Sequence, residues 1–157
     1  MSICSYLFKS TREEIENLTE TEKLRQNFKG IESTGIDPTT LTILESILTG
    51  EDLYQIYEKG EYSVIKKVDE EDDNSPLFVS SSTSLMNSLK ELDTKKIKDV
   101  LNMWCSTQEM KLYGWTPRKA KHIIDWLVKI SKQDHSPEEQ IILYIDMSED
   151  EPIAQSV

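Results

Sequence analysis

The sequence lacks the motifs that most metal, nucleotide and covalent chemistry requires. Its five glycines never form the glycine-rich loops that hold phosphate groups. Two histidines and two cysteines occur, and they form neither C-x-x-C nor H-E-x-x-H, the spacings typical of zinc sites. We therefore expect no cofactor and no metal site, and we expect a protein without enzymatic activity more than an enzyme.

Long hydrophobic runs are also absent. No stretch approaches the roughly 20 apolar residues that span a bilayer, and the first residues lack the basic region and cleavage site of a secretory signal. The sequence thus predicts a cytoplasmic protein without a membrane partner. A length of 157 residues, with 37% hydrophobic and 30% charged residues, is typical of one globular domain with one core.

Basic residues are scarce outside one segment. The chain has 18 Lys and Arg against 29 Asp and Glu, a net charge of −11. Residues 93–132 hold nine of the basic and four of the acidic residues, so the rest of the chain carries a charge of −16. Such an acidic surface repels nucleic acid and anionic lipid and favours a basic protein partner, although solubility alone is the simpler interpretation.

The segment 93–132 predicts two amphipathic helices joined by an aromatic turn. Apolar residues recur at helical spacing over 94–106 and 117–131. Asp93 and Thr116 are suitable capping residues, and Pro117 suits the first position of the second helix. We predict that Trp104 and Trp126, in or beside the two apolar stripes, are buried. Their expected partners on the last strand are Ile141, Leu143 and Ile145.

Strand patterns lie near the two ends and the middle of the chain, separated by helical segments. The predicted strands are 3–8, 62–68, 77–80 and 140–147. The last is the most apolar and is predicted to be central, whereas 30–35 is expected to be a loop. The prediction is a single α+β domain over 1–147, with a small mixed sheet covered by helices, and an acidic, flexible tail over 148–157.

Two stretches near the N-terminus carry a family resemblance. SICSYLFKSTREEIENL is a strand followed by a capped helix, and GIDPTTLTILESILTGEDL is a helix led by Ile36-Asp37 and ended by Leu48-Thr49-Gly50. Both resemble the YfbM-like family of bacterial proteins of unknown function, although the aromatic residues typical of that family's second helix are absent here. The resemblance implies an α+β fold and a bacterial cytoplasmic setting, and it implies no catalytic residues.

The few candidates for catalysis have simple structural interpretations. A Cys105–His122 pair, with Asp125 or Glu109, is the conceivable nucleophilic site. Burial of both Cys4 and Cys105 as reduced thiols is the favoured alternative. The second histidine, His135, is expected in an exposed turn.

Candidate binding residues fall into three groups. Tyr113 and Trp115 precede a basic cluster, which suits protein binding or single-stranded nucleic acid, although packing of the turn is the more common role. The helix after residue 11 exposes Glu13, Glu16 and Glu20. The run DEEDD at 69–73 is expected to be a solvated loop, with a divalent-cation site as the alternative.

Two functions from different classes are therefore carried forward. The leading hypothesis is a small interaction protein without enzymatic activity, comparable to inhibitors or immunity proteins, that binds a basic partner through Glu13, Glu16, Glu20, Tyr113 and Trp115. The alternative is an enzyme with a carboxylate site or a Cys105/His122 site. A closed cleft that gathers Cys105, His122 and acidic residues would favour the enzyme.

Overall fold

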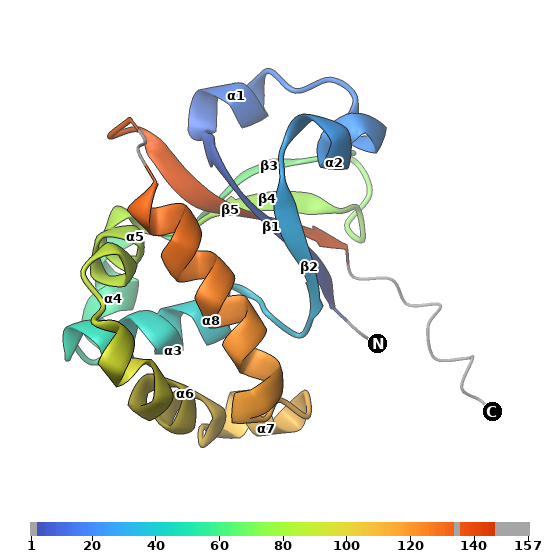
Figure 1. Ribbon diagram of the computed structural model, residues 1–157. Helices are drawn as coiled ribbons and strands as arrows, with labels where there is room; N and C mark the ends of the chain where they lie inside the picture. The colour runs from blue at the N-terminus through green and yellow to red at the C-terminus, as the bar shows by residue number, and fades with distance from the viewer. Residues whose placement is uncertain (1–2, 134–135, 147–157) are drawn as a thin grey trace.

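The protein has an α+β fold built on a five-stranded antiparallel sheet (Figure 1). The computed structural model describes residues 3–133 and 136–146. The sheet has the strand order β2-β1-β5-β4-β3. Its strands are β1 (Cys4–Thr11), β2 (Gly30–Thr34), β3 (Ser63–Lys67), β4 (Leu77–Ser80) and β5 (Glu139–Asp146).

Helical segments fill most of the connections between the strands. They are α1 (Arg12–Glu16), η1 (Thr21–Lys23), α2 (Leu24–Asn27), α3 (Pro38–Thr49), α4 (Leu53–Lys59), α5 (Thr83–Lys90), η2 (Thr94–Lys96), α6 (Ile97–Cys105), α7 (Gln108–Leu112) and α8 (Pro117–Lys132). The expected caps of the last region are present: the Asp93 side chain accepts from the Lys95 N–H, and Thr116 accepts from the Lys119 N–H.

The predicted central position of the last strand is confirmed, since β5 lies between β1 and β4. The expectation of a mixed sheet is wrong, because every ladder is antiparallel. Helices in the connections do not require parallel neighbours here: α1 and α2 lie between the adjacent antiparallel strands β1 and β2, and α5 to α8 lie between the adjacent antiparallel strands β4 and β5. The loop expected at 30–35 is also wrong: Gly30–Thr34 forms the edge strand β2 against β1.

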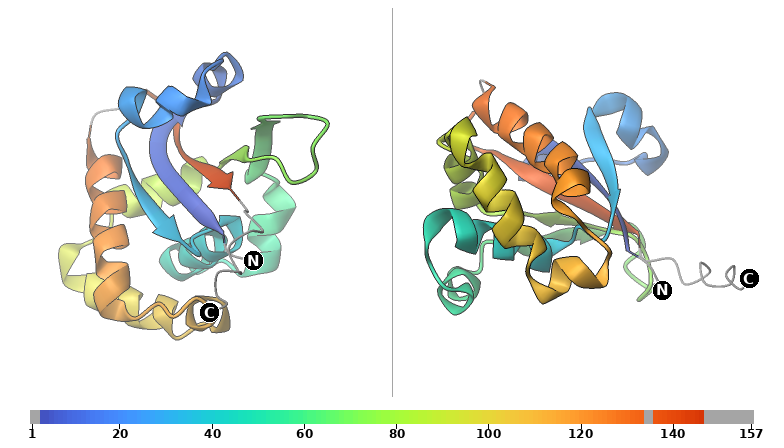
Figure 2. Two further views of the ribbon diagram at one scale, coloured as in Figure 1. Left: turned by 90° about the vertical axis from the view of Figure 1, so that its right-hand side faces the viewer. Right: turned by 60° about the horizontal axis from the view of Figure 1, so that its bottom comes forward.

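Side chains alternate between the two faces of the sheet and enter two separate cores. Leu7, Leu143 and Ile145 join the larger core, which α3, α5, α6 and α8 complete. Tyr6 and Phe8, on the other face, join a smaller core with Ile15 of α1 and Leu24 of α2. Helices α3, α5, α6 and α8 thus lie on one side of the sheet, and α1 and α2 lie on the other (Figures 1 and 2).

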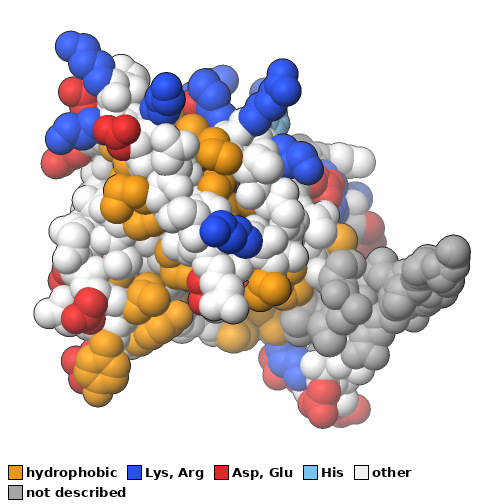
Figure 3. Space-filling view, turned by 90° about the horizontal axis from the view of Figure 1, so that it is seen from below, with side chains coloured by type: hydrophobic (Ala, Val, Ile, Leu, Met, Phe, Trp, Pro, Cys, Tyr) orange, Lys and Arg blue, Asp and Glu red, His pale blue; other side chains and the backbone are white. Residues whose placement is uncertain are grey.

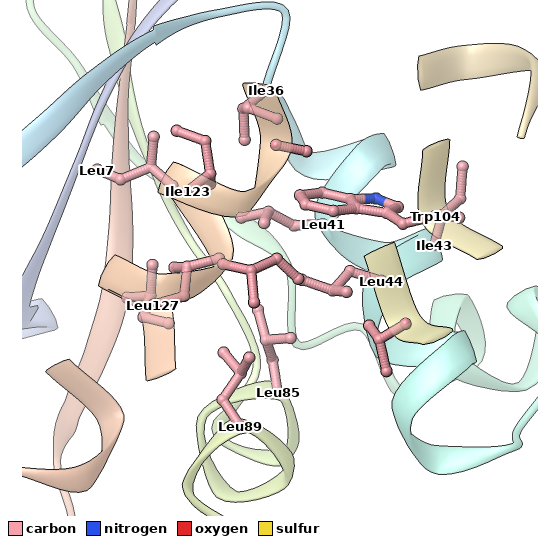
Figure 4. Close-up of a cluster of buried hydrophobic side chains, with 14 of the residues drawn as sticks. Leu7, Ile36, Leu41, Ile43, Leu44, Leu85, Leu89, Trp104, Ile123 and Leu127 are labelled. Atoms are coloured by element: carbon pink, nitrogen blue, oxygen red, sulfur yellow. The ribbon is translucent and has the colours of Figure 1, made fainter. Parts of the chain in front are cut away.

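The two helices of the 93–132 region pack against each other in the larger core, on the same side of the sheet. Helix α8 brings Ile123 and Leu127 into one cluster with the apolar residues of β5, whereas α6 packs against α3 and α8 (Figure 4). Trp104 of α6 is fully buried, as predicted. Trp126 is only half-buried at the edge of the larger core, so its predicted full burial is wrong.

The two cysteines also differ from each other. Both are free, and Cys105 is buried as predicted, but Cys4 is exposed at the start of β1, so its predicted burial is wrong. The expected tail at 148–157 and the turn with His135 lie outside the described residues. Among the residues that the structure describes, no helix is long and apolar enough to cross a membrane.

Candidate functional site

The short helix α1 sits on the smaller core and exposes a row of glutamates. Its N-terminus has a capping box, in which Thr11 Oγ1 accepts from the Glu14 N–H and Glu14 Oε1 accepts from the Thr11 N–H. Ile15 is fully buried and Arg12 is partly buried, whereas the three glutamates of this single turn point outward. Glu13 and Glu16 are exposed as a direct consequence, and Glu20 is exposed in the segment that follows.

Two side-chain anchors fix the segment 12–18 against strands β3 and β4. The Arg12 guanidinium donates hydrogen bonds of 3.2 Å to Ser63 Oγ and Ser80 Oγ. At the other end of the segment, Lys66 Nζ donates a 2.7 Å hydrogen bond to the Leu18 carbonyl. The glutamates therefore project from a segment that is held at both ends.

We use the name acidic ridge for Glu13, Glu16 and Glu20. The ridge separates two hollows in the surface. One hollow, of about 650 Å³, lies between α1 and α2 and is lined by residues that include Glu13, Glu20 and Phe28. The other, of about 580 Å³, is lined by residues that include Arg12, Glu13 and Glu16. Glu13 lines both hollows, so a partner that entered either one would contact it.

The carboxylates of this region differ in how they are engaged. Glu14 belongs to the capping box, and Glu20 forms a 3.0 Å ion pair with Lys23. In the described part of the chain, Glu13 and Glu16 have no ion-pair partner. These two exposed carboxylates are therefore available to pair with cations from another molecule.

The aromatic candidates lie at the opposite end of the molecule, beyond α7 (Figure 1). The Tyr113 side chain packs against Gly35, and burial together with the charge of Asp37 raises the pKa of its phenol. Trp115 is half-buried against the larger core, and its Nε1 is buried without a hydrogen-bond partner among the described residues. The structure therefore does not bring the acidic and aromatic candidates into one site.

The conceivable catalytic pair is not assembled either. Cys105 is buried, and desolvation raises the pKa of its thiol, which disfavours the reactive thiolate. His122 is exposed on α8, and no hydrogen bond joins the two side chains among the described residues. Asp125 forms a 2.6 Å ion pair with Lys121 and is engaged there.

Acidic residues of the 69–73 loop stabilise their own turn. Asp69 Oδ1 accepts from the Glu71 N–H at 3.1 Å, and Asp72 Oδ1 accepts from the Asn74 N–H at 2.9 Å. Within residues 3–133 and 136–146, no group of three or more histidine, cysteine or acidic side chains is placed to hold a metal ion. The loop is exposed, as the solvated-loop interpretation expects.

Two features escaped sequence reasoning. The first is a buried carboxylate: Glu45 of α3 is 1% exposed, and its Oε1 accepts hydrogen bonds from the hydroxyls of Tyr62 (2.8 Å) and Ser82. A single acid inside the apolar run LTILESIL was the available signal. The second is a groove between α6 and α8, which no sequence pattern indicates because it depends on how the two helices pack.

No protein-family model, no curated protein and no solved structure matches this chain. The likeness of two N-terminal stretches to the YfbM-like family therefore stays a prediction.

Proposed function

We propose that this protein is an interaction module without enzymatic activity, which binds a basic protein partner in the bacterial cytoplasm through the acidic ridge. Its action would be comparable to that of inhibitors or immunity proteins. The observation that carries the proposal is that Glu13 and Glu16 are exposed, unpaired within the described residues, and held between two hollows by an anchored helix.

Physical considerations support a role in partner selection. The chain has a net charge of −11, which attracts a basic protein over distances longer than a single contact. Opposite charge accelerates encounter and selects partners, whereas packed anchor residues set affinity. The hollows on either side of Glu13 offer space for such anchors, and Phe28 and Leu18 line the larger one.

The test compares three forms of the full-length protein as bait in lysate of its host. The first is the wild type, the second is E13Q/E16Q/E20Q, and the third is the matched control E58Q/E61Q/E70Q. The control removes three exposed acids elsewhere, so both variants have the same net charge.

We expect a basic protein to be captured by the wild type and the control but not by the ridge variant, and the purified pair to form again in isolation. Equal capture by the two variants would show that net charge, and not the ridge, attracts the partner. Capture only of acidic or neutral proteins would contradict the proposal.

The alternative function, an enzyme, has no observation of comparable weight. The Cys105 thiol is buried with a raised pKa, and His122 lies exposed without contacting it. The enzyme alternative would be favoured if the protein acted on a small substrate and Cys105→Ser lost this activity with an unchanged melting temperature.

A further inference from the structure

A groove between α6 and α8 has the opposite character to the acidic ridge. It has a volume of about 610 Å³. Its apolar lining comes from Ile97 and Leu101 of α6 and Pro117 of α8. In the view from below, hydrophobic side chains lie among Lys and Arg side chains along the upper edge of the molecule (Figure 3). The groove is therefore an apolar surface with a basic border.

The border carries cations that the protein itself does not neutralise. Lys98, Arg118 and Lys121 line the groove together with Asp125. Asp125 pairs with Lys121 at 2.6 Å, whereas Lys98 and Arg118 have no ion-pair partner within the described ranges. In a chain with a net charge of −11, two unpaired cations beside one apolar groove are a local reversal of charge.

The first turn of α8 adds to this positive potential. Pro117 and Arg118 are its first residues, so the groove lies at the N-terminal end of a 16-residue helix. The helix dipole places partial positive charge there, and it favours a carboxylate that approaches this end. Arg118 can also bind a carboxylate with two parallel hydrogen bonds.

We propose that this groove binds a short acidic segment of a partner protein. One apolar side chain of that segment would insert between α6 and α8, and flanking carboxylates would pair with Lys98 and Arg118. We choose an acidic segment as the occupant because its carboxylates are complementary in charge to Lys98 and Arg118. A nucleic acid is disfavoured, because no aromatic side chain among the described residues lines the groove to stack on bases, and the net negative charge of the chain repels phosphate. This inference is independent of the acidic ridge.

The test begins with a library of random 12-residue peptides displayed against the immobilised full-length protein. We expect the selected peptides to combine Asp or Glu with one bulky apolar residue. A synthetic copy of the best peptide then serves as the probe for affinity measurements by fluorescence polarisation. Selected peptides without acidic enrichment, or no selected peptide at all, would contradict the proposal.

Variants locate the peptide on the surface. K98E/R118E should weaken binding by at least about tenfold, because two attractive pairs become repulsive, whereas K111E/K129E makes the same change in net charge outside the groove and should leave affinity nearly unchanged. Ile97→Gln should also weaken binding, because it makes the lining polar. All variants must melt like the wild type.

Two outcomes of this comparison would overturn the inference. Equal weakening by the two charge-reversal pairs would show a response to net charge alone. Displacement of the peptide by a 20-nucleotide oligothymidine at comparable concentration would show that the groove accepts phosphate backbones without selecting acidic peptides.

Discussion

The indole Nε1 of Trp104 donates a 3.0 Å hydrogen bond to the backbone carbonyl of Thr40, which ties α6 to the first turn of α3 inside the larger core. Trp104→Ala should lower the free energy of unfolding by about 3–5 kcal/mol, because it leaves a large cavity. Trp104→Phe keeps most of the volume and should cost about 1–2 kcal/mol. Trp126→Ala should cost less than Trp104→Ala, because Trp126 is half-exposed. Urea denaturation measures all three.

A second prediction concerns Gly35, which is buried with φ +93°, and Tyr113. A Cβ at Gly35 would lie 2.5 Å from the Tyr113 ring, so Gly35→Ala should destabilise by about 2–3 kcal/mol. Gly50 is the matched control: its φ is +81°, a Cβ there would have no atom of the described residues within 4 Å, and Gly50→Ala should cost about 1 kcal/mol. The G35A/Y113A double variant should lose less stability than the sum of the losses of the two single variants, because the clash between the new Cβ and the Tyr113 ring disappears. Additive losses would show that the contact does not matter.

The hydrogen-bonded pair of the buried Glu45 and the partly buried Tyr62 predicts that stability is sensitive to alkaline pH. Burial, the charge of Glu45 and the hydrogen bond to it hold the pKa of Tyr62 well above 10.0. The folded protein therefore keeps the phenol proton that the unfolded chain loses near pH 10, so stability is complete below that pH and falls as pH rises above it.

The measurement is the urea midpoint of the wild type and Tyr62→Phe at pH 8 and pH 11. The wild type should lose more stability than Tyr62→Phe, because the variant lacks this titrating group. The other tyrosines are common to both proteins, and the difference isolates Tyr62. An equal loss in both proteins would show that the Tyr62 proton is not linked to folding.

Trp115 can have one of two roles, packing of the turn or recognition of a partner, and one substitution distinguishes them. If it only packs the turn between α7 and α8, Trp115→Ala should cost less stability than Trp104→Ala and leave partner binding intact, since Trp115 is half-buried. If it is a recognition residue, the same change should leave the melting temperature nearly unmoved and abolish binding. Melting and affinity of the same preparation decide between the two roles.

Local signals predicted local structure well. Asp37-Pro38 and Thr116-Pro117 start α3 and α8, and the apolar run within 140–146 forms the central strand β5. The edge strand β2 and the antiparallel direction of the strands were missed, whereas the other edge strand, β3, was predicted. The side-chain pattern of β2 contains little apolar alternation, and the direction of strand pairing cannot be read from the residues of one strand. The burial of Cys4 was misjudged: most of the residues that follow it in β1 are buried, but Cys4, the first residue of the strand, is exposed.

The candidate sites were partly predictable. Exposed glutamates follow from helical spacing around Ile15, so the acidic ridge is visible in the sequence. Its separation from Tyr113 and Trp115 is a property of the tertiary fold. The groove between α6 and α8 depends on the packing of two helices at Leu101 and Pro117, and spacing within either helix cannot show it.

The most direct test of the central claim is the association rate of the purified partner as a function of salt and charge. Raising salt from 0.1 M to 1 M shortens the Debye length from about 10 Å to about 3 Å, so the rate for the wild type should fall steeply. E13Q/E16Q/E20Q should associate slowly already at 0.1 M and respond weakly to salt, whereas E58Q/E61Q/E70Q should behave like the wild type. An association rate that changes neither with salt nor with the ridge substitution would contradict binding through the acidic ridge.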